Sequence, residues 1–148
     1  MASASTPTRT PGAAELVARR YPEEIATEGK LDLIDEICTE DVLDHSPLGE
    51  IKGHEEQKAQ IRMLRDAFGD FSATVEDVVT EGDMVAMRVT LRGMHKGEFM
   101  GAEPTGNTFE VSNMVFTRVE DGMIAERWVI PDMMGMLTQL GIVELPSM

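Results

Sequence analysis

Cysteine is nearly absent from this sequence, and the chain contains no long apolar run. Cys38 has no second cysteine to pair with, which is typical of a protein from a reducing compartment, and a free cysteine is usually a small buried side chain. No apolar run approaches the roughly 18 residues of a membrane-spanning helix. The first residues lack the charged-then-apolar pattern of a signal peptide. We therefore expect a soluble, cytoplasmic protein with no membrane partner.

Basic residues are also scarce. The chain has 27 acidic residues against 13 basic ones, so its formal net charge is −14. A surface this negative repels phosphate backbones and anionic lipids, which disfavours nucleic acid as a partner. An acid-rich, lysine-poor composition resembles that of proteins from salt-loving organisms, where counter-ions screen the self-repulsion. An ordinary acidic bacterial protein is an equally good interpretation.

The 148 residues are enough for one domain with its own core. Residues 1–12 are rich in Ser, Thr, Ala and Pro, and we expect a disordered head there, followed by a single domain over 13–148. Apolar residues at helical spacing predict a helix that Pro22 kinks and Gly29 ends. A short second helix follows, then an extended piece over 41–45 and a third helix over about 54–68.

From Phe71 onward the apolar period changes from helical to two. This pattern predicts strands over 71–79, 84–92, 109–119 and 123–130, with a closing helix over 133–140. Helices followed by strands favour an α+β domain. We expect a cone-shaped, curved antiparallel sheet wrapped around the three N-terminal helices, with an open end that holds a small molecule.

A glycine-rich loop over 93–106 lies between the second and third predicted strands. It is longer than a simple reversal of direction needs, and it carries His95, Glu98 and Phe99. We expect this loop to form one wall of a pocket.

Strand periodicity places Glu126, Trp128, Ile130 and Asp132 on one face of the last strand. Periodicity alone does not say which face lines the cavity. If the Trp128 face is inward, Asp132 lies at the rim of an apolar chamber, where partial desolvation raises the pKa of a carboxyl. The simpler alternative is that Asp132 caps the final helix.

These segments together resemble a known family. The stretch Gly93-Met94-His95-Lys96-Gly97-Glu98-Phe99-Met100-Gly101, with Pro104-Thr105-Gly106, is similar to the loop motif of SnoaL-like polyketide cyclases, often labelled ester cyclases. Glu126, Trp128 and Asp132 also fall at that family's spacing. The resemblance spans roughly residues 15 to 141. The family is similar in fold to ketosteroid isomerase and nuclear transport factor two, which agrees with the expected cone.

The resemblance implies a cofactor-free intramolecular aldol cyclisation of a small lipophilic polyketide or ester. The aspartate matching Asp132 would be the general acid/base that removes a proton between two carbonyls, so that the enolate attacks an aldehyde of the same molecule. His95 or His45 would orient Asp132 or donate to an oxyanion. The expected substrate contacts are Trp128, Asn113, Met114, Phe99, Tyr21 and Met133. The family also implies a homodimer that pairs through the outer sheet face.

Other functions stay open at this point. Another acid/base enzyme on the same cone, an isomerase or an epoxide hydrolase, is one alternative, and a non-catalytic domain that binds a lipophilic ligand is another. The spacing of the three histidines matches no tight metal-ligand pattern, so we expect no metal site.

Overall fold

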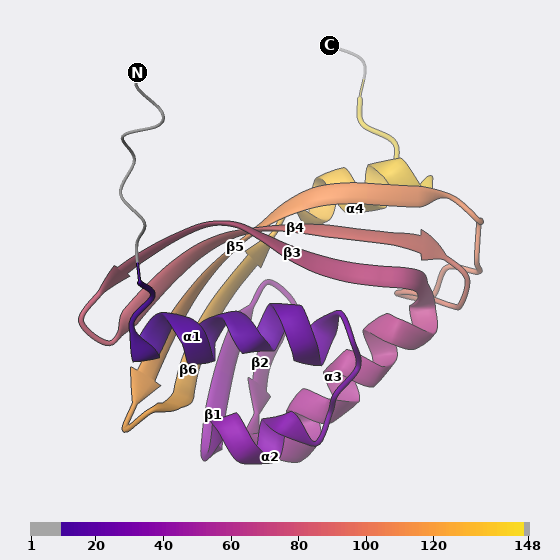
Figure 1. The fold of residues 1–148 in the computed structure, drawn as a ribbon. Helices are drawn as coiled ribbons and strands as arrows, with labels where there is room; N and C mark the ends of the chain where they lie inside the picture. The colour runs from indigo at the N-terminus through magenta and orange to yellow at the C-terminus, as the bar shows by residue number, and fades with distance from the viewer. Residues whose placement is uncertain (1–9, 147–148) are drawn as a thin grey trace, which may run out of the picture.

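The computed structural model describes residues 10–146, so most of the predicted head at residues 1–12 lies outside the described residues. The described fold has five helices and six strands. Most of the helices come first, the last four strands follow one another, and the fifth helix ends the fold (Figure 1). In chain order the elements are α1 (Ala13–Arg20), η2 (Tyr21–Ala26), α2 (Leu33–Ile37), β1 (Cys38–Ser46), β2 (Gly49–Lys52), α3 (Gly53–Ala67), β3 (Phe68–Glu81), β4 (Met84–His95), β5 (Thr108–Glu120), β6 (Met123–Pro131) and α4 (Met133–Leu140).

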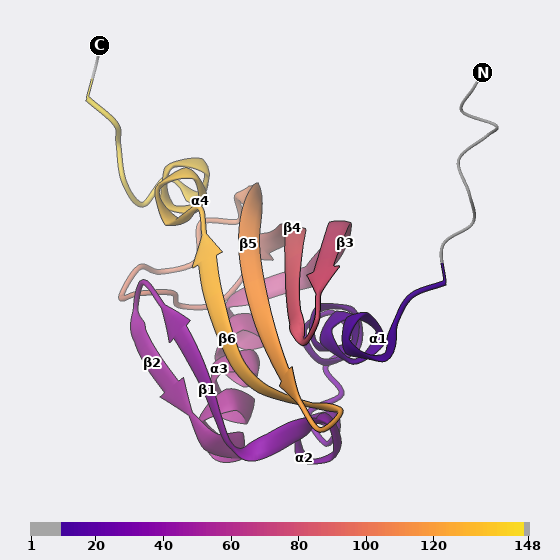
Figure 2. The same ribbon diagram turned by 90° about the vertical axis from the view of Figure 1, so that its left-hand side faces the viewer.

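The strands form one curved sheet in the order β2-β1-β6-β5-β4-β3. Every neighbouring pair is antiparallel except β1 and β6, which run parallel. Figures 1 and 2 show α1, α2 and α3 under the curved sheet, and α4 beyond the end of β6. The predicted α+β cone is therefore confirmed, with two corrections. The sheet is mixed rather than antiparallel, because β1 and β6 run parallel. The predicted extended piece at 41–45 is part of β1, and β1 and β2 enlarge the sheet from four strands to six.

The first helix changes type where proline occurs. Pro22 has no backbone N–H to continue the α-helical ladder, and the chain forms one wider π-helical segment over η2. Its last turn is closed by the Thr27 N–H, which donates to the carbonyl of Pro22 at 3.2 Å. Gly29 then adopts φ +76°, so the predicted helix end at this glycine is also present.

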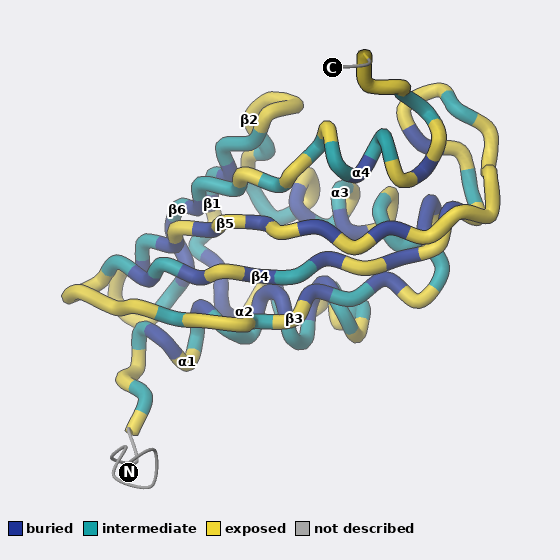
Figure 3. Tube along the Cα trace, turned by 90° about the horizontal axis from the view of Figure 1, so that it is seen from above, coloured by how far each residue is buried: buried dark blue, intermediate teal, exposed yellow. Residues whose placement is uncertain are grey.

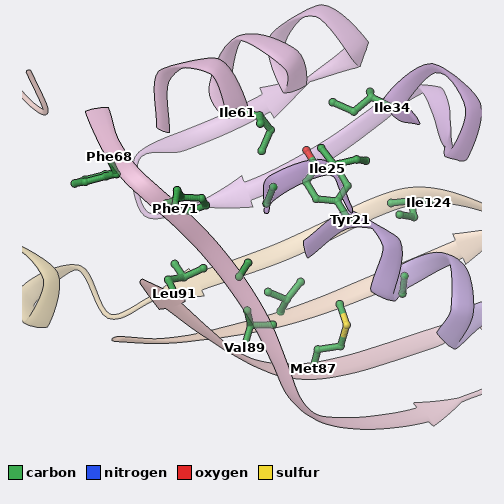
Figure 4. Close-up of a cluster of buried hydrophobic side chains, with 14 of the residues drawn as sticks. Tyr21, Ile25, Ile34, Ile61, Phe68, Phe71, Met87, Val89, Leu91 and Ile124 are labelled. Atoms are coloured by element: carbon green, nitrogen blue, oxygen red, sulfur yellow. The ribbon is translucent and has the colours of Figure 1, made fainter. Parts of the chain in front are cut away.

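The core lies between the concave face of the sheet and the helices. Tyr21, Ile25 and Ile34 come from the helical side of this cluster, and Val89 and Leu91 come from the sheet (Figure 4). At one end Phe68 is fully buried, with the rings of Phe71, Phe99 and Phe109 around it at centroid distances of 6.3, 4.9 and 4.9 Å. Buried and exposed residues alternate along β5 (Figure 3), because successive side chains of a strand point to opposite faces.

A β-bulge in β6 breaks that alternation. Arg118 of β5 pairs with Glu126, whereas the next residue, Val119, pairs with Ile124, so Ala125 is an extra residue in β6. Ile124 is buried, but after the bulge Glu126 and the residues in phase with it lie on the outer face. The inward residues of β6 beyond the bulge are therefore Arg127, Val129 and Pro131. An unbroken period of two that starts at the buried Ile124 would instead put Glu126, Trp128 and Ile130 inside.

The start of the glycine-rich loop packs tightly on the end of α3. The N–H groups of Lys96 and Gly97 both donate to the carbonyl of Ala67, at 2.9 and 3.0 Å. A Cβ atom at Gly97 would overlap the backbone carbonyl oxygen of Asp66, which has no room to move away. Glycine at this position is thus required by close backbone approach.

We expect Gly97→Ala to lower the free energy of unfolding by about 1–3 kcal/mol, the usual cost of overpacking. Gly69→Ala is the matched control, because the nearest atom to a Cβ there is the flexible end of Met94 at 3.4 Å. Urea unfolding of the two variants measures the difference. Equal stabilities would show that the loop does not rest on α3 in this way.

Candidate functional site

A hollow opens between the concave face of the sheet, α3, η2 and the start of α4. Its walls are mostly apolar, with side chains such as Ile61, Leu64, Phe71, Val89, Leu91 and Val129. The polar residues among its walls are few: Tyr21, Asp44, Ser46, Gln60, Asn113 and Arg127. Apolar walls with a small number of polar groups are the usual composition of a small-molecule site.

Asp44 and Arg127 form a buried ion pair in this hollow. They are direct neighbours in the parallel pairing of β1 and β6, so both side chains point to the concave side. Arg127 Nη1 donates to Asp44 Oδ2 at 2.7 Å, and each side chain is only 7% exposed. A charged hydrogen bond in such an environment is screened little by solvent, and removing one partner leaves an uncompensated buried charge.

Two further side chains hold the pair in place. The guanidinium carbon of Arg127 lies 3.7 Å from the centre of the Tyr21 ring, a cation–π contact. The Tyr21 hydroxyl donates to Gln57 Oε1, and Gln57 Nε2 donates to the carbonyl of Ile51 at 3.2 Å. The network therefore connects η2, α3, β1 and β6, and it restricts the orientation of the guanidinium.

Burial dominates the electrostatics of this network. It raises the pKa of Asp44 above the ordinary carboxyl value, although Arg127 and Gln57 act in the opposite direction. Burial likewise raises the pKa of Tyr21 well above its usual value and that of the neighbouring Cys38 to about 12. The tyrosine and the cysteine are therefore neutral at physiological pH.

Three residues of the hollow carry buried polar atoms that have no hydrogen-bond partner within the described part of the chain. They are Asp44 Oδ1, Arg127 Nε and Asn113 Oδ1. A buried polar atom without a partner costs about 1–3 kcal/mol. These three atoms belong to residues that line the hollow, and each is buried.

Comparison with known proteins identifies the family. A family model described as SnoaL-like polyketide cyclase matches residues 15–140. The chain belongs to this family. The resemblance noted from the glycine-rich loop and the Trp128-to-Asp132 spacing is thereby confirmed.

Relatives within the family support the same assignment. The aklanonic acid methyl ester cyclase DauD of Streptomyces sp. (strain C5) is 31% identical over 132 residues, which are 84% of this chain and 80% of that protein. The nogalonic acid methyl ester cyclase of Streptomyces nogalater is 32% identical over 117 residues, 76% of this chain and 87% of that one. The crystal structure of IdmH, a candidate polyketide cyclase from Streptomyces antibioticus, has a TM-score of 0.77 at 34% identity, covering 86% of this chain and 98% of that one.

Four of the residues expected from the sequence to contact substrate line the hollow. Tyr21, Phe99, Asn113 and Met133 all contribute to its walls. Met114 and Trp128 do not, because they lie on the opposite face of the sheet: Met114 is 47% exposed, and Trp128 stacks on His45 with ring centroids 5.3 Å apart. The bulge at Ala125 is the physical reason for the correction at Trp128.

Asp132 also lies outside the hollow. It is exposed at the N-cap of α4, and its Oδ1 accepts the N–H of Gly135 at 2.8 Å. The condition that would place this carboxylate at the rim of an apolar chamber, an inward Trp128 face, is not met, and the simpler alternative, a helix cap, describes its position. The catalytic role that the resemblance implies for Asp132 stays a prediction.

The two histidines expected near the site lie elsewhere. His95 is buried at the end of β4, where its Nδ1 accepts the N–H of Thr105 at 3.2 Å and so fastens the far end of the glycine-rich loop. His45 lies on the outer face, with its Nε2 2.6 Å from Glu126 and its Nδ1 3.2 Å from Glu50. The hydrogen bond to Glu126 is the main cause that raises the pKa of His45. Neither histidine is among the residues that line the hollow.

Asp44, Gln57 and Arg127 are not among the site residues expected from the sequence. Asp44 could have been found from its neighbour His45. Both lie in the predicted extended piece, and a strand period of two puts them on opposite faces, so an outward His45 implies an inward Asp44. No local signal identifies Arg127, because its direction depends on the bulge and its partner lies 83 residues away. Only the parallel pairing of β1 with β6 brings the two together.

Residues 10–146 contain neither a cluster of metal-ligating side chains nor a membrane-spanning helix. Within 10–146, no group of three His, Cys, Asp or Glu side chains lies close enough to hold a metal ion. None of the described helices is both long and apolar enough to cross a membrane.

We expect Arg127→Gln to lower the free energy of unfolding by about 3–5 kcal/mol at neutral pH, because it leaves Asp44 as an unpaired buried charge. Arg127 lowers the pKa of Asp44, so its removal raises the folded-state pKa further above the ordinary 3.8. Stability is lost as pH rises through a raised folded-state carboxyl pKa, and below 3.8 that carboxyl is protonated in both states. The difference from wild type should therefore shrink as the pH falls.

Arg88→Gln is the control for that measurement. Arg88 is 45% exposed and pairs with the exposed Asp77, so its loss should cost no more than about 1 kcal/mol. Denaturant unfolding at several pH values compares the two variants. An Arg127→Gln protein with wild-type stability at neutral pH would contradict the buried ion pair.

Proposed function

We propose that this protein catalyses the cofactor-free, intramolecular aldol-type cyclisation of a small lipophilic polyketide ester. One observation carries the proposal: a largely apolar hollow encloses the buried pair of Asp44 and Arg127. Membership of the SnoaL-like polyketide cyclase family and the names of the ester cyclase relatives support it.

The composition of the hollow suits this reaction. An intramolecular aldol step needs the flexible chain of the substrate folded so that its two reacting carbons meet, and apolar walls favour a compact, dehydrated pose. It also needs a base for one acidic proton and a group that stabilises negative charge on oxygen. Asp44 and Arg127 are groups of these two kinds, and they lie side by side.

We expect the purified protein to convert aklanonic acid methyl ester or nogalonic acid methyl ester into a product of unchanged mass and changed chromatographic retention. The mass is unchanged because an aldol ring closure neither gains nor loses atoms. Liquid chromatography with mass spectrometry follows the reaction, and boiled protein is the control.

Other results would favour the alternatives. Conversion of a conjugated-ketone steroid, without conversion of either ester, would favour an isomerase. Hydrolysis of a lipophilic epoxide would favour an epoxide hydrolase. Saturable binding of the esters without any product would favour a binding domain.

We also propose that two copies associate through the outer face of the sheet. An apolar patch lies there, made of Met114, Phe116, Trp128 and Ile130 on β5 and β6. Phe116 is 51% and Ile130 59% exposed, and the register pairs Phe116 with Trp128 and Met114 with Ile130. Adjoining exposed apolar side chains of this size are typical of an interaction surface.

We expect light scattering to give the mass of a dimer for wild type and of a monomer for Phe116→Glu. A glutamate in the centre of the patch would bury an unpaired charge at the interface. Met100→Glu is the control, since Met100 is also exposed but belongs to the loop between β4 and β5. A wild-type monomer, or a Phe116→Glu dimer, would contradict this mode of association.

A further inference from the structure

The hollow contains one group that can accept a proton as a carboxylate. Among the described residues that line it, Asp44 is the only carboxylic acid, Arg127 is the only basic residue, and no histidine is present. Asp132, the carboxylate that the family resemblance suggests, is exposed and occupied as the cap of α4.

We propose that Asp44 is the residue that moves the proton in the cyclisation, and that Arg127 beside it positions Asp44 and stabilises the enolate oxygen of the substrate. This inference rests on the proposed function. It assigns a proton-transfer site to a pair of residues on β1 and β6.

The bonding of the pair fits these roles. Asp44 uses Oδ2 for Arg127 Nη1 and has no hydrogen bond on Oδ1, while Arg127 has no hydrogen bond on Nε. The two residues are therefore joined by one hydrogen bond, and each also has a buried polar atom without a partner among the described residues. The guanidinium cannot easily turn away, because the Tyr21 ring lies against it at 3.7 Å.

The reaction balances with this pair alone. The carboxylate of Asp44 takes the proton from the carbon between two carbonyls, and the C–H bonding pair becomes the enolate. The enolate carbon bonds to the carbon of a third carbonyl group, elsewhere in the same molecule, whose π pair moves onto its oxygen. That oxygen then takes the proton back from Asp44, so the residue ends the cycle as a carboxylate.

Charge also stays balanced in the hollow through these steps. Before the reaction Arg127 is paired with the Asp44 carboxylate at 2.7 Å. When Asp44 takes the proton, the negative charge moves to the substrate oxygen, and the positive charge of the neighbouring Arg127 guanidinium stabilises it there. Because the net charge next to Arg127 is the same before and after, the apolar walls do not oppose the transfer.

The position of Asn113 suggests the shape of the substrate. Arg127 lies opposite Thr117 in the β5–β6 register and Asn113 lies opposite Pro131, so the two polar ends are four residues apart along β6. This is about 13 Å at the usual rise of a strand. Asn113, with its unpartnered Oδ1, is placed to bind a hydroxyl at the far end of an elongated molecule whose middle is apolar.

The central experiment compares Asp44→Asn with wild type on the two methyl esters. We expect kcat to fall by at least about 100-fold, the usual contribution of a positioned general base, with KM little changed. Asp41→Asn is the matched control, because Asp41 is exposed on the same strand and the substitution removes the same charge. Asn113→Leu should instead raise KM more than it lowers kcat.

Two further variants separate chemistry from folding. Asp44→Asn leaves the buried Arg127 without its anion, which could affect folding. The double variant Asp44→Asn, Arg127→Gln removes both charges. We expect thermal melting to show that the double variant is folded, and we expect it to be inactive. Asp44→Glu should recover part of the activity. In wild type, kcat/KM should rise with pH through a midpoint above the ordinary carboxyl range, because burial raises the pKa of Asp44. In Asp44→Glu that midpoint should have a different value. A merely structural aspartate would not move this midpoint.

A second measurement keeps the inference testable if neither ester cyclises. The probe is a methyl β-keto ester with no further carbonyl group that could accept the enolate. Deuterium exchange at the carbon between its ketone and its ester, followed by NMR in D2O, reports proton removal without ring closure. Exchange by wild type that Asp44→Asn abolishes supports the assignment, whether or not cyclisation occurs. The assignment is overturned if wild type does not accelerate exchange, if folded Asp44→Asn keeps wild-type kcat or exchange, or if Asp132→Asn loses turnover while Asp44→Asn does not.

Discussion

The buried ion pair of Asp44 and Arg127 is the interaction on which the site depends. Each charge alone would be costly in an apolar hollow, and the two are acceptable there because they neutralise each other at 2.7 Å. Tyr21 and Gln57 complete the arrangement from η2 and α3. Such a pair contributes little net stability, so its presence in an otherwise apolar cavity is better explained by the chemistry it allows than by folding.

The pair exists only because the last strand accepts β1 as a parallel neighbour. Antiparallel strands joined by short turns, such as β3–β4 and β5–β6, need only local contacts. The β1–β6 contact joins segments about 80 residues apart, and it places Asp44 directly beside Arg127. One consequence is that the polar centre of the hollow forms only when the two ends of the chain are assembled on one sheet.

Much of this architecture could be predicted from local patterns. The change of period at Phe71, the turns at Gly82 and Gly122 and the amphipathic helices all reappear in the structure. The site could be predicted less well, for two physical reasons. The single extra residue Ala125 reverses the direction of every later side chain in β6, which moved Trp128 out of the hollow and Arg127 into it. An aspartate before a helix looks the same in sequence whether it is a cap or a catalyst, and only the Gly135 contact decides the position of Asp132.

The two faces of β1 and β6 carry different sets of side chains, because successive residues of a strand point to opposite faces. Asp44 and Arg127 face the hollow, whereas their sequence neighbours His45 and Trp128 stack together on the outer face. His45 is held between Glu50 and Glu126, and Arg118 also reaches Glu126 at 3.3 Å. A partner bound on the outer face would therefore touch residues directly adjacent in the chain to the ion pair. Because successive side chains of a strand share one backbone, a displacement of β1 or β6 would move residues on both faces together.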